Sequence, residues 1–245
     1  MKNETSHRIE RGGTALSARH RPGTGPTLVF LPGLRSAMTA DKASALIDFS
    51  ATRGRASLRL DYSGHGESGG RFEDGSIGIW RDDALAVIEA LAPGPVILVG
   101  SSMGGWIGLL AGIALGDRVE GFVGIAAAPD FTRSIEAGLD AGQREALTRD
   151  GLVMLPAEPD PMPLTRRALD DGAACCVMDG PIPLTCPVRL LHGQQDDVVA
   201  WSTALDIAAR VASNDCQVIL VKDGDHRLSR PQDLSLLTTV VDGLF

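Results

Sequence analysis

The stretch VILVGSSMGGWIGLLAGIAL, Val96–Leu115, contains no charged residue and is long enough to cross a bilayer as one helix. Two features favour a different structure. Glycines, which are weak helix formers, interrupt the run, and two serines lie at its centre. The β-branched VILV is typical of a strand buried on both faces, and MGGWIGLLAGIAL is typical of a helix. We therefore expect a strand, a sharp turn and a helix instead of a membrane span.

The same alternation continues along the chain. Apolar, strand-like runs are followed by stretches in which apolar residues recur at helical spacing. The expected strands are residues 27–33, 56–62, 96–99, 121–128, 186–193 and 216–221, and the expected helices are 40–52, 76–91, 103–115, 201–212 and 232–244. This order predicts an α/β fold with a mostly parallel central sheet and helices on both faces. HRIE and TALSARH, near the N-terminus, have no helix between them and predict an antiparallel hairpin at one edge.

One segment interrupts this pattern. Residues 130–185 are too many for a simple crossover between two strands. They contain two amphipathic stretches, 132–151 and 164–178, on either side of the proline-rich LPAEPDPMPL. We predict that residues 1–129 and 186–245 form the core and that residues 130–185 form an inserted helical cap over the carboxyl ends of the strands.

The composition and net charge of the chain argue against some classes of binding partner. The net charge is −8 and the pI is about 5.1, which argues against nucleic acid or an anionic membrane surface as the main partner. The N-terminal MKNETSHRIERGG has no apolar core of the kind a secretory signal requires. The four cysteines form no C-x-x-C pair and no zinc-like spacing with histidine: Cys175, Cys176, Cys186 and Cys216. We expect reduced thiols in a cytoplasmic protein.

The turn between the expected strand and helix carries a candidate nucleophile. GSSMG matches the pattern G-x-S-x-G with Ser102 at its centre. A serine on a sharp strand-to-helix turn needs small residues two positions to either side, and Gly100 and Gly104 meet this need. The turn exposes the hydroxyl group and leaves the backbone N–H of Met103 at a helix N-terminus, where it can stabilise an anion. The alternative is a small-residue turn in which Ser102 only caps the helix.

A serine nucleophile needs a histidine base. His226 follows the last expected strand, so its loop lies at the same edge of the sheet as Ser102, and it is the best candidate. His7 and His20 lie in the expected hairpin and are interpreted as surface residues. His65, on a loop at the carboxyl end of a strand, is interpreted as structural, with a place in the lining of the site as the alternative. His192, at a strand end, is interpreted as structural.

The base needs a carboxylate to orient it, and this group is expected in the loop after the strand 186–193. Asp196 and Asp197 both lie there. The spacing H-G-x-x-D-x-x-V favours Asp196, and the chain order Ser, Asp, His agrees with a known type of hydrolase. For either aspartate, a helix N-cap or a solvated loop carboxylate is the alternative.

An oxyanion formed at Ser102 needs two N–H donors. Met103 supplies one candidate, and the loop after the strand 27–33 should supply the other. Pro32 has no N–H group, so the backbone N–H of Leu34 is the choice. The neighbouring Arg35 is a candidate anion-binding side chain or a surface residue.

On these motifs the sequence resembles the α/β-hydrolase-fold serine hydrolases. The stretches FLPGLRSAMTADKA, RLDYSGHGES, IWRDD, VILVGSSMGGW, PIPLTCPVRLLHGQQDDVVAW and DGDHRLSRPQDL resemble, more narrowly, the branch of palmitoyl-protein thioesterases and acyl-glucuronide esterases of mycophenolic acid glucuronide. They cover most of the chain outside residues 130–178. The resemblance implies that Ser102, Asp196 and His226 form a catalytic triad. Ala200 departs from it, because the pattern commonly has proline there.

These observations predict an esterase or thioesterase that acts through an acyl-enzyme on a small-molecule substrate, without metal or organic cofactor. The alternatives are cleavage of a carbon–carbon bond or acyl transfer on the same triad, and a receptor that binds a ligand without turnover. Apolar residues of the cap should contribute to an acyl pocket. Met154 and Met162 are the candidates, because unbranched methionine side chains adapt to varied ligands. We expect a preference for short to medium apolar acyl groups.

Overall fold

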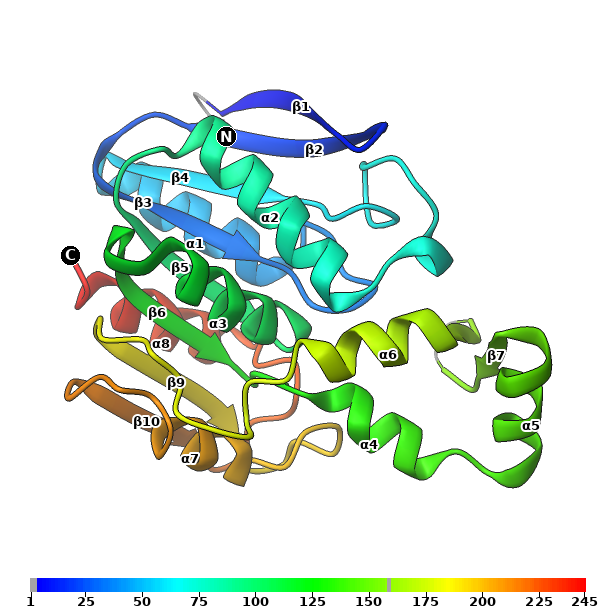
Figure 1. Ribbon diagram of the computed structural model, residues 1–245. Helices are drawn as coiled ribbons and strands as arrows, with labels where there is room; N and C mark the ends of the chain where they lie inside the picture. The colour runs from blue at the N-terminus through cyan, green and yellow to red at the C-terminus, as the bar shows by residue number, and fades with distance from the viewer. Residues whose placement is uncertain (1–3, 158–159) are drawn as a thin grey trace.

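The computed structural model describes residues 4–157 and 160–245. Its main element is an eight-stranded sheet with the strand order β1-β2-β4-β3-β5-β6-β9-β10 (Figure 1). β1 pairs antiparallel with β2, and β2 with β4, while the other neighbours are parallel. The expected edge hairpin and the mostly parallel sheet are therefore confirmed. The strands are β1 (Thr5–Arg11), β2 (Thr14–Arg21), β3 (Thr24–Leu31), β4 (Arg55–Leu60), β5 (Val96–Ser101), β6 (Val119–Ile125), β9 (Val188–Gly193) and β10 (Cys216–Val221).

Helices cover both faces of the sheet, as the alternation of elements predicts. The helices α2, α3 and α7 share one apolar cluster with the sheet, to which Val87, Trp106 and Ile207 belong. The helices α1 and α8 share a second cluster on the other face, through Leu46 and Leu237. Their bounds are α1 (Asp41–Thr52), α2 (Ile77–Leu91), α3 (Met103–Leu115), α7 (Ser202–Ala208) and α8 (Pro231–Asp242), and two single turns of 3-10 helix are Phe72–Asp74 and Gly116–Arg118.

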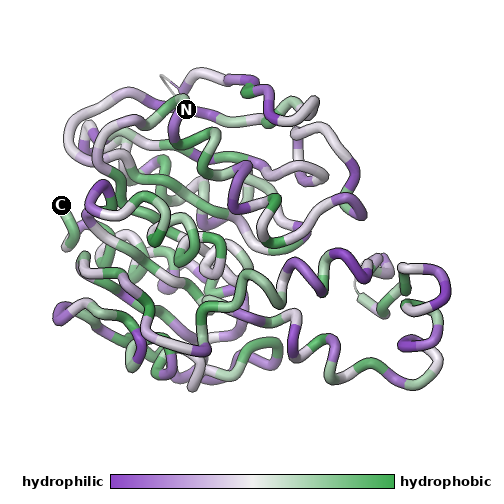
Figure 2. The backbone as a smooth tube through the Cα atoms, viewed as in Figure 1, coloured by the Kyte–Doolittle hydropathy of each residue, from purple (hydrophilic) through white to green (hydrophobic). Residues whose placement is uncertain are grey.

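The apolar run Val96–Leu115 is divided as expected. Its first part is the fully buried strand β5, between β3 and β6 in the sheet, and its second part is α3. No helix in the described residues is both long and apolar enough to span a bilayer. Figure 2 shows that hydrophobic residues are concentrated along the central strands and α3.

Two of the glycines in this run contribute to the packing of α3 and not to the turn. A Cβ atom at Gly108 would lie 2.8 Å from the ring of Phe122 in β6, and one at Gly112 would lie 2.8 Å from Leu184. Both distances are shorter than van der Waals contact, so glycine lets α3 lie close to the sheet and to the chain that precedes β9. The composition of the run therefore reflects the packing of the helix as well as its turn.

The residues between β6 and β9 include a smaller unit that projects beyond the carboxyl ends of the central strands (Figure 1). It has its own apolar cluster, formed by Leu139, Leu147, Val153, Leu164 and Leu169. Its elements are α4 (Phe131–Gly138), α5 (Ala141–Asp150), β7 (Leu152–Leu155), β8 (Met162–Thr165) and α6 (Arg166–Ala174). We use the name cap for the described part of residues 130–185.

The cap differs from the expectation in two respects. Residues 132–151, expected as one helical stretch, form two helices, because Asp140 begins a new helix and forms a capping box with Gln143. The second difference is the antiparallel pair of β7 and β8, which flanks the proline-rich segment and was not expected. Proline is tolerated here because a two-stranded pair consists of edge strands.

A buried carboxylate fixes the base of the cap. Asp130 accepts a hydrogen bond from the backbone N–H of Val177 (2.9 Å) and another from that of Met178 (3.0 Å). These contacts join the residue that enters α4 to the chain that leaves α6. Trp106 of α3 also donates its indole N–H to the carbonyl oxygen of Cys175, at 3.1 Å. The base of the cap is therefore held against the helix that follows Ser102.

Candidate active site

Ser102 lies on a strained turn between β5 and α3. Its backbone angles are φ 54° and ψ −119°, a region that side chains rarely adopt. Cβ atoms at the flanking glycines would collide with backbone, at Gly100 with the carbonyl oxygen of Gly104 and at Gly104 with that of Leu31. Both glycines are thus required by the close approach of the backbone, as the G-x-S-x-G spacing predicts.

Three side chains from three loops are connected by hydrogen bonds at this turn. His226, between β10 and α8, has its Nε2 atom 3.1 Å from Ser102 Oγ. Its Nδ1 atom is 2.8 Å from Asp196 Oδ2, in the loop after β9. An ionised carboxylate only accepts, so Nδ1 carries the proton and Nε2 is free to accept one from the serine hydroxyl. The structure thus brings together the three residues that the sequence singled out.

The carboxylate of Asp196 is fully buried and receives hydrogen bonds at both oxygens. Oδ1 accepts from the backbone N–H groups of Val198 (2.9 Å) and Val199 (2.8 Å). Burial by itself raises the pKa of Asp196, but the N–H donors of Val199, His226 and Val198 together outweigh it, so the pKa lies below its usual range. Asp197 is exposed, and its carboxylate makes no hydrogen bond within the described residues.

Two other histidines are buried, and they differ in their surroundings. His65 packs edge-on against Tyr62 and Trp80, burial lowers its pKa, and within the described residues it makes no hydrogen bond to the three side chains at the turn. His192 is different, because its Nε2 atom lies 3.0 Å from Asp196 Oδ2. This contact differs from the expectation, in which His192 had no part in the site. The available signal was the spacing of four residues that places His192 at the strand end and Asp196 across the following turn.

Of the two candidate oxyanion donors, Leu34 borders a cavity together with Ser102, and Met103 directly follows Ser102 in the chain. The cavity is about 280 Å³ and is lined by Ser102, His226, Gly33 and Leu34 among others. A Cβ atom at Gly33 would lie 3.4 Å from the Cβ of Ser102, so this loop approaches the serine closely. Among the described residues, the backbone N–H groups of Leu34 and Met103 have no hydrogen-bond acceptor. Both N–H groups are therefore available to a bound group.

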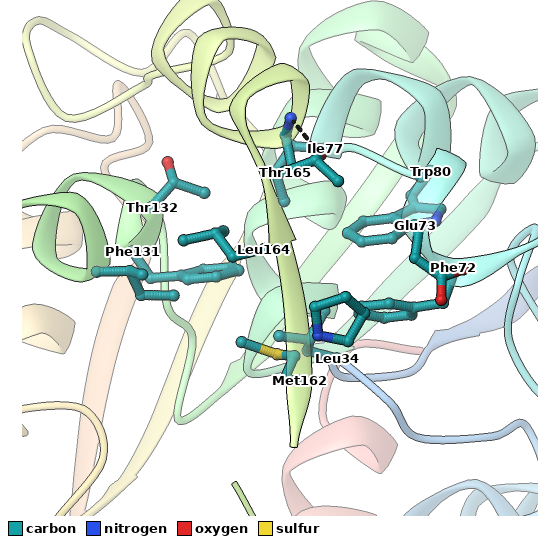
Figure 3. Close-up of a pocket in the computed structure, with 14 residues that line it drawn as sticks. Leu34, Phe72, Glu73, Ile77, Trp80, Phe131, Thr132, Met162, Leu164 and Thr165 are labelled. Atoms are coloured by element: carbon teal, nitrogen blue, oxygen red, sulfur yellow. Dashed lines mark hydrogen bonds between the residues drawn. The ribbon is translucent and has the colours of Figure 1, made fainter. Parts of the chain in front are cut away.

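Leu34 also borders a second, apolar cleft between the core and the cap (Figure 3). The free space in this cleft is about 40 Å³, and its lining residues include Phe72, Ile77 and Trp80 from the core and Phe131, Ile135, Met162 and Leu164 from the cap. Of the two methionines proposed to bind substrate, only Met162 lines this cleft. Met154 is 50% exposed, because strand alternation directs its neighbour Val153 inward and Met154 outward.

Three cationic side chains line the cavity at Ser102. They are Arg35, Lys42 and Arg227, and none has an ion-pair partner in the described residues, although Asp41 lines the same cavity. Lys42 donates to the carbonyl oxygen of Arg227, and burial, followed by the charge of Arg227, lowers its pKa to about 8. Arg35 donates to the carbonyl oxygen of Asp160 in the cap, at 2.7 Å. The cavity therefore has a basic border in a protein of net negative charge.

Fold and site together are those of a hydrolase. The profile of the alpha/beta hydrolase family matches residues 28–235, and the chain belongs to this family.

Relatives of this chain are known in bacteria and in mammals. The mitochondrial palmitoyl-protein thioesterase ABHD10 of Homo sapiens is 38% identical, over 94% of this chain and 80% of its own length. A hydrolase structure from Agrobacterium vitis S4 is 38% identical with a TM-score of 0.92 and covers 99% of this chain and 98% of its own. The alpha/beta hydrolase domain-containing protein 10 from mouse is 36% identical with a TM-score of 0.90, and it covers 98% of both chains.

Proposed function

We propose that this hydrolase cleaves carboxylic esters or thioesters of apolar acyl groups through an acyl-enzyme on Ser102. The observation that carries the proposal is the pair of hydrogen bonds from Ser102 to His226 (3.1 Å) and from His226 to Asp196 (2.8 Å). Two unpaired backbone N–H groups beside the serine, those of Leu34 and Met103, support it further.

In the proposed mechanism His226 Nε2 removes the hydroxyl proton of Ser102 as Oγ attacks the acyl carbonyl. The N–H groups of Leu34 and Met103 stabilise the oxyanion, and Asp196 stabilises the imidazolium. His226 then gives the proton to the leaving oxygen or sulfur, and the acyl group stays on Ser102. A water molecule, deprotonated by His226, attacks the acyl-enzyme; the acid is released and Ser102 recovers its proton.

The cleft beside Leu34 supports an apolar acyl group as substrate. Its lining is mostly aromatic and aliphatic, and its free space is about 40 Å³. A short to medium acyl chain therefore suits it better than a long one. Similarity to a palmitoyl-protein thioesterase supports thioesters as substrates alongside oxygen esters. A hydrolysis panel across acyl lengths, on matched oxygen and sulfur leaving groups, tests the proposal, and absence of turnover on all of them would refute it.

Replacing Met162 with tryptophan should shift the preference toward shorter acyl chains. The larger side chain fills part of the cleft, so kcat/KM for an octanoyl ester should fall by about tenfold relative to an acetyl ester. Met154→Trp is the matched control, because Met154 is exposed on the neighbouring strand and should leave the ratio unchanged. An equal loss on both esters in Met162→Trp would show that Met162 supports only the fold.

The basic border of the cavity predicts a preference for negatively charged leaving groups. Arg227→Gln should raise KM about threefold to tenfold for an ester whose leaving group carries a carboxylate, with little change for the neutral methyl ester of the same leaving group. Arg118→Gln is the control, because Arg118 lies at the amino end of β6, far along the sheet from the site. An equal rise for both substrates would mean that Arg227 acts only by supporting the loop of His226.

A further inference from the structure

His192 is a buried histidine that the proposed mechanism does not use. It lies in β9, opposite Leu220 of β10, and none of its surface is exposed. Its Nε2 atom is 3.0 Å from Asp196 Oδ2 and 3.1 Å from the carbonyl oxygen of Val199. Its Nδ1 atom is buried and has no partner among the described residues.

These contacts define the protonation state of His192. Both neighbours of Nε2 are acceptors, so Nε2 carries a proton and donates it. A proton on Nδ1 would be a buried donor without an acceptor, which costs more than an unpaired lone pair. The ring is therefore neutral, with its proton on Nε2, and acts as a fixed hydrogen-bond donor to the acid.

We propose that His192 is a positioning residue that acts on the reaction through Asp196. The proposal rests on the proposed function, in which Asp196 stabilises the imidazolium of His226. Asp196 Oδ2 accepts from both rings, from His226 at 2.8 Å and from His192 at 3.0 Å. Together with the two N–H groups on Oδ1, His192 fixes the plane of the carboxylate. Its N–H group also interacts with the negative charge of Oδ2, which would otherwise act on His226 alone.

Removal of this donor should shift the pH dependence of activity in a predictable direction. Without His192, the negative charge of Oδ2 interacts with His226 only, and the protonated form of His226 becomes more stable. His226 must be neutral to accept the serine proton, so activity should begin at higher pH. The charged groups of the adjoining cavity are unchanged by such a substitution: Arg35, Asp41, Lys42 and Arg227. Asp196 is the only titratable side chain bonded to His192 in the described residues.

The kinetic test uses two substitutions of His192 on a neutral ester. His192→Leu fills the space without a donor, and the acidic limb of the kcat/KM profile should move up by about 0.5–1 pH unit. The amide of His192→Gln can donate from near the Nε2 position, so the acidic limb of this variant should lie at the wild-type pH. His65→Leu, a buried histidine without contact to the triad, should lower stability without moving the limb. An unmoved limb in His192→Leu, or an equal shift in His192→Gln, would overturn the proposal.

A second measurement needs no variant and no turnover. In ¹⁵N-histidine-labelled wild-type protein, NMR should show His192 as the neutral tautomer with the proton on Nε2 throughout the pH range of activity. A proton on Nδ1, or a charged ring in that range, would refute the assignment even if His192→Leu does not fold. Failure of the proposed function would look different, because Ser102→Ala would then retain turnover whatever the state of His192.

Discussion

Replacing Ser102 with alanine is expected to reduce kcat by a factor of about 10⁴–10⁶. The substitution removes the Oγ atom that His226 contacts at 3.1 Å, and with it the nucleophile of the proposed mechanism. A small residual rate should remain, because the proposed oxyanion donors, the N–H groups of Leu34 and Met103, are still present when water attacks. Alanine, like serine, is strained at φ 54°, so the fold should be retained, and thermal unfolding checks this point.

The nucleophile can also be identified directly. A fluorophosphonate probe should label the wild-type protein, and peptide mass spectrometry should place the adduct on Ser102. Ser101→Ala is the matched control, because Ser101 lies in the same cavity at the end of β5, and this variant should be labelled fully. An adduct on Ser101, or full esterase activity in Ser102→Ala, would disprove the assignment.

The parts of the site that the sequence predicts depend on short-range signals and on one rule of topology. The glycines at positions 100 and 104 identify the turn, because no other residue fits against the backbone there. The carboxyl ends of parallel strands lie at one edge of a sheet, so loops after β5, β9 and β10 must meet. This rule brings Ser102, Asp196 and His226 into one region without any knowledge of distances.

The features that the sequence missed depend on contacts between segments far apart in the chain. The strand alternation that directs Met154 to solvent and Val153 inward exists only because β7 pairs with β8 across the proline-rich segment. The second contact of Asp196, to His192, depends on the backbone conformation of the loop after β9. Periodicity and spacing describe single elements, and they do not specify which side of a carboxylate a neighbouring ring will face.

Asparagine in place of Asp196 is expected to lower kcat/KM by about 10⁴-fold. Oδ1 accepts two backbone N–H groups, and Oδ2 accepts from His226 and His192. An amide has only one oxygen. If that oxygen stays with the backbone N–H groups, the NH₂ group faces Nδ1 of His226, which must then accept instead of donate. The proton moves to Nε2, and His226 can no longer take one from Ser102.

The opposite orientation of the amide is also unfavourable, because the NH₂ group would then face the N–H groups of Val198 and Val199 and displace the loop. Asp197→Asn is the matched control: Asp197 is exposed and should tolerate the change with little loss of activity.

The pKa of Asp196 is lowered in the fold, so its carboxylate stabilises the protein above the pH at which an unfolded aspartate titrates. This contribution is lost as the pH falls through the folded pKa. Thermal unfolding should therefore show Asp196→Asn less stable than wild type at neutral pH, with the difference shrinking in acid. A mild effect of Asp196→Asn on turnover beside a severe one of Asp197→Asn would transfer the role of the acid to Asp197.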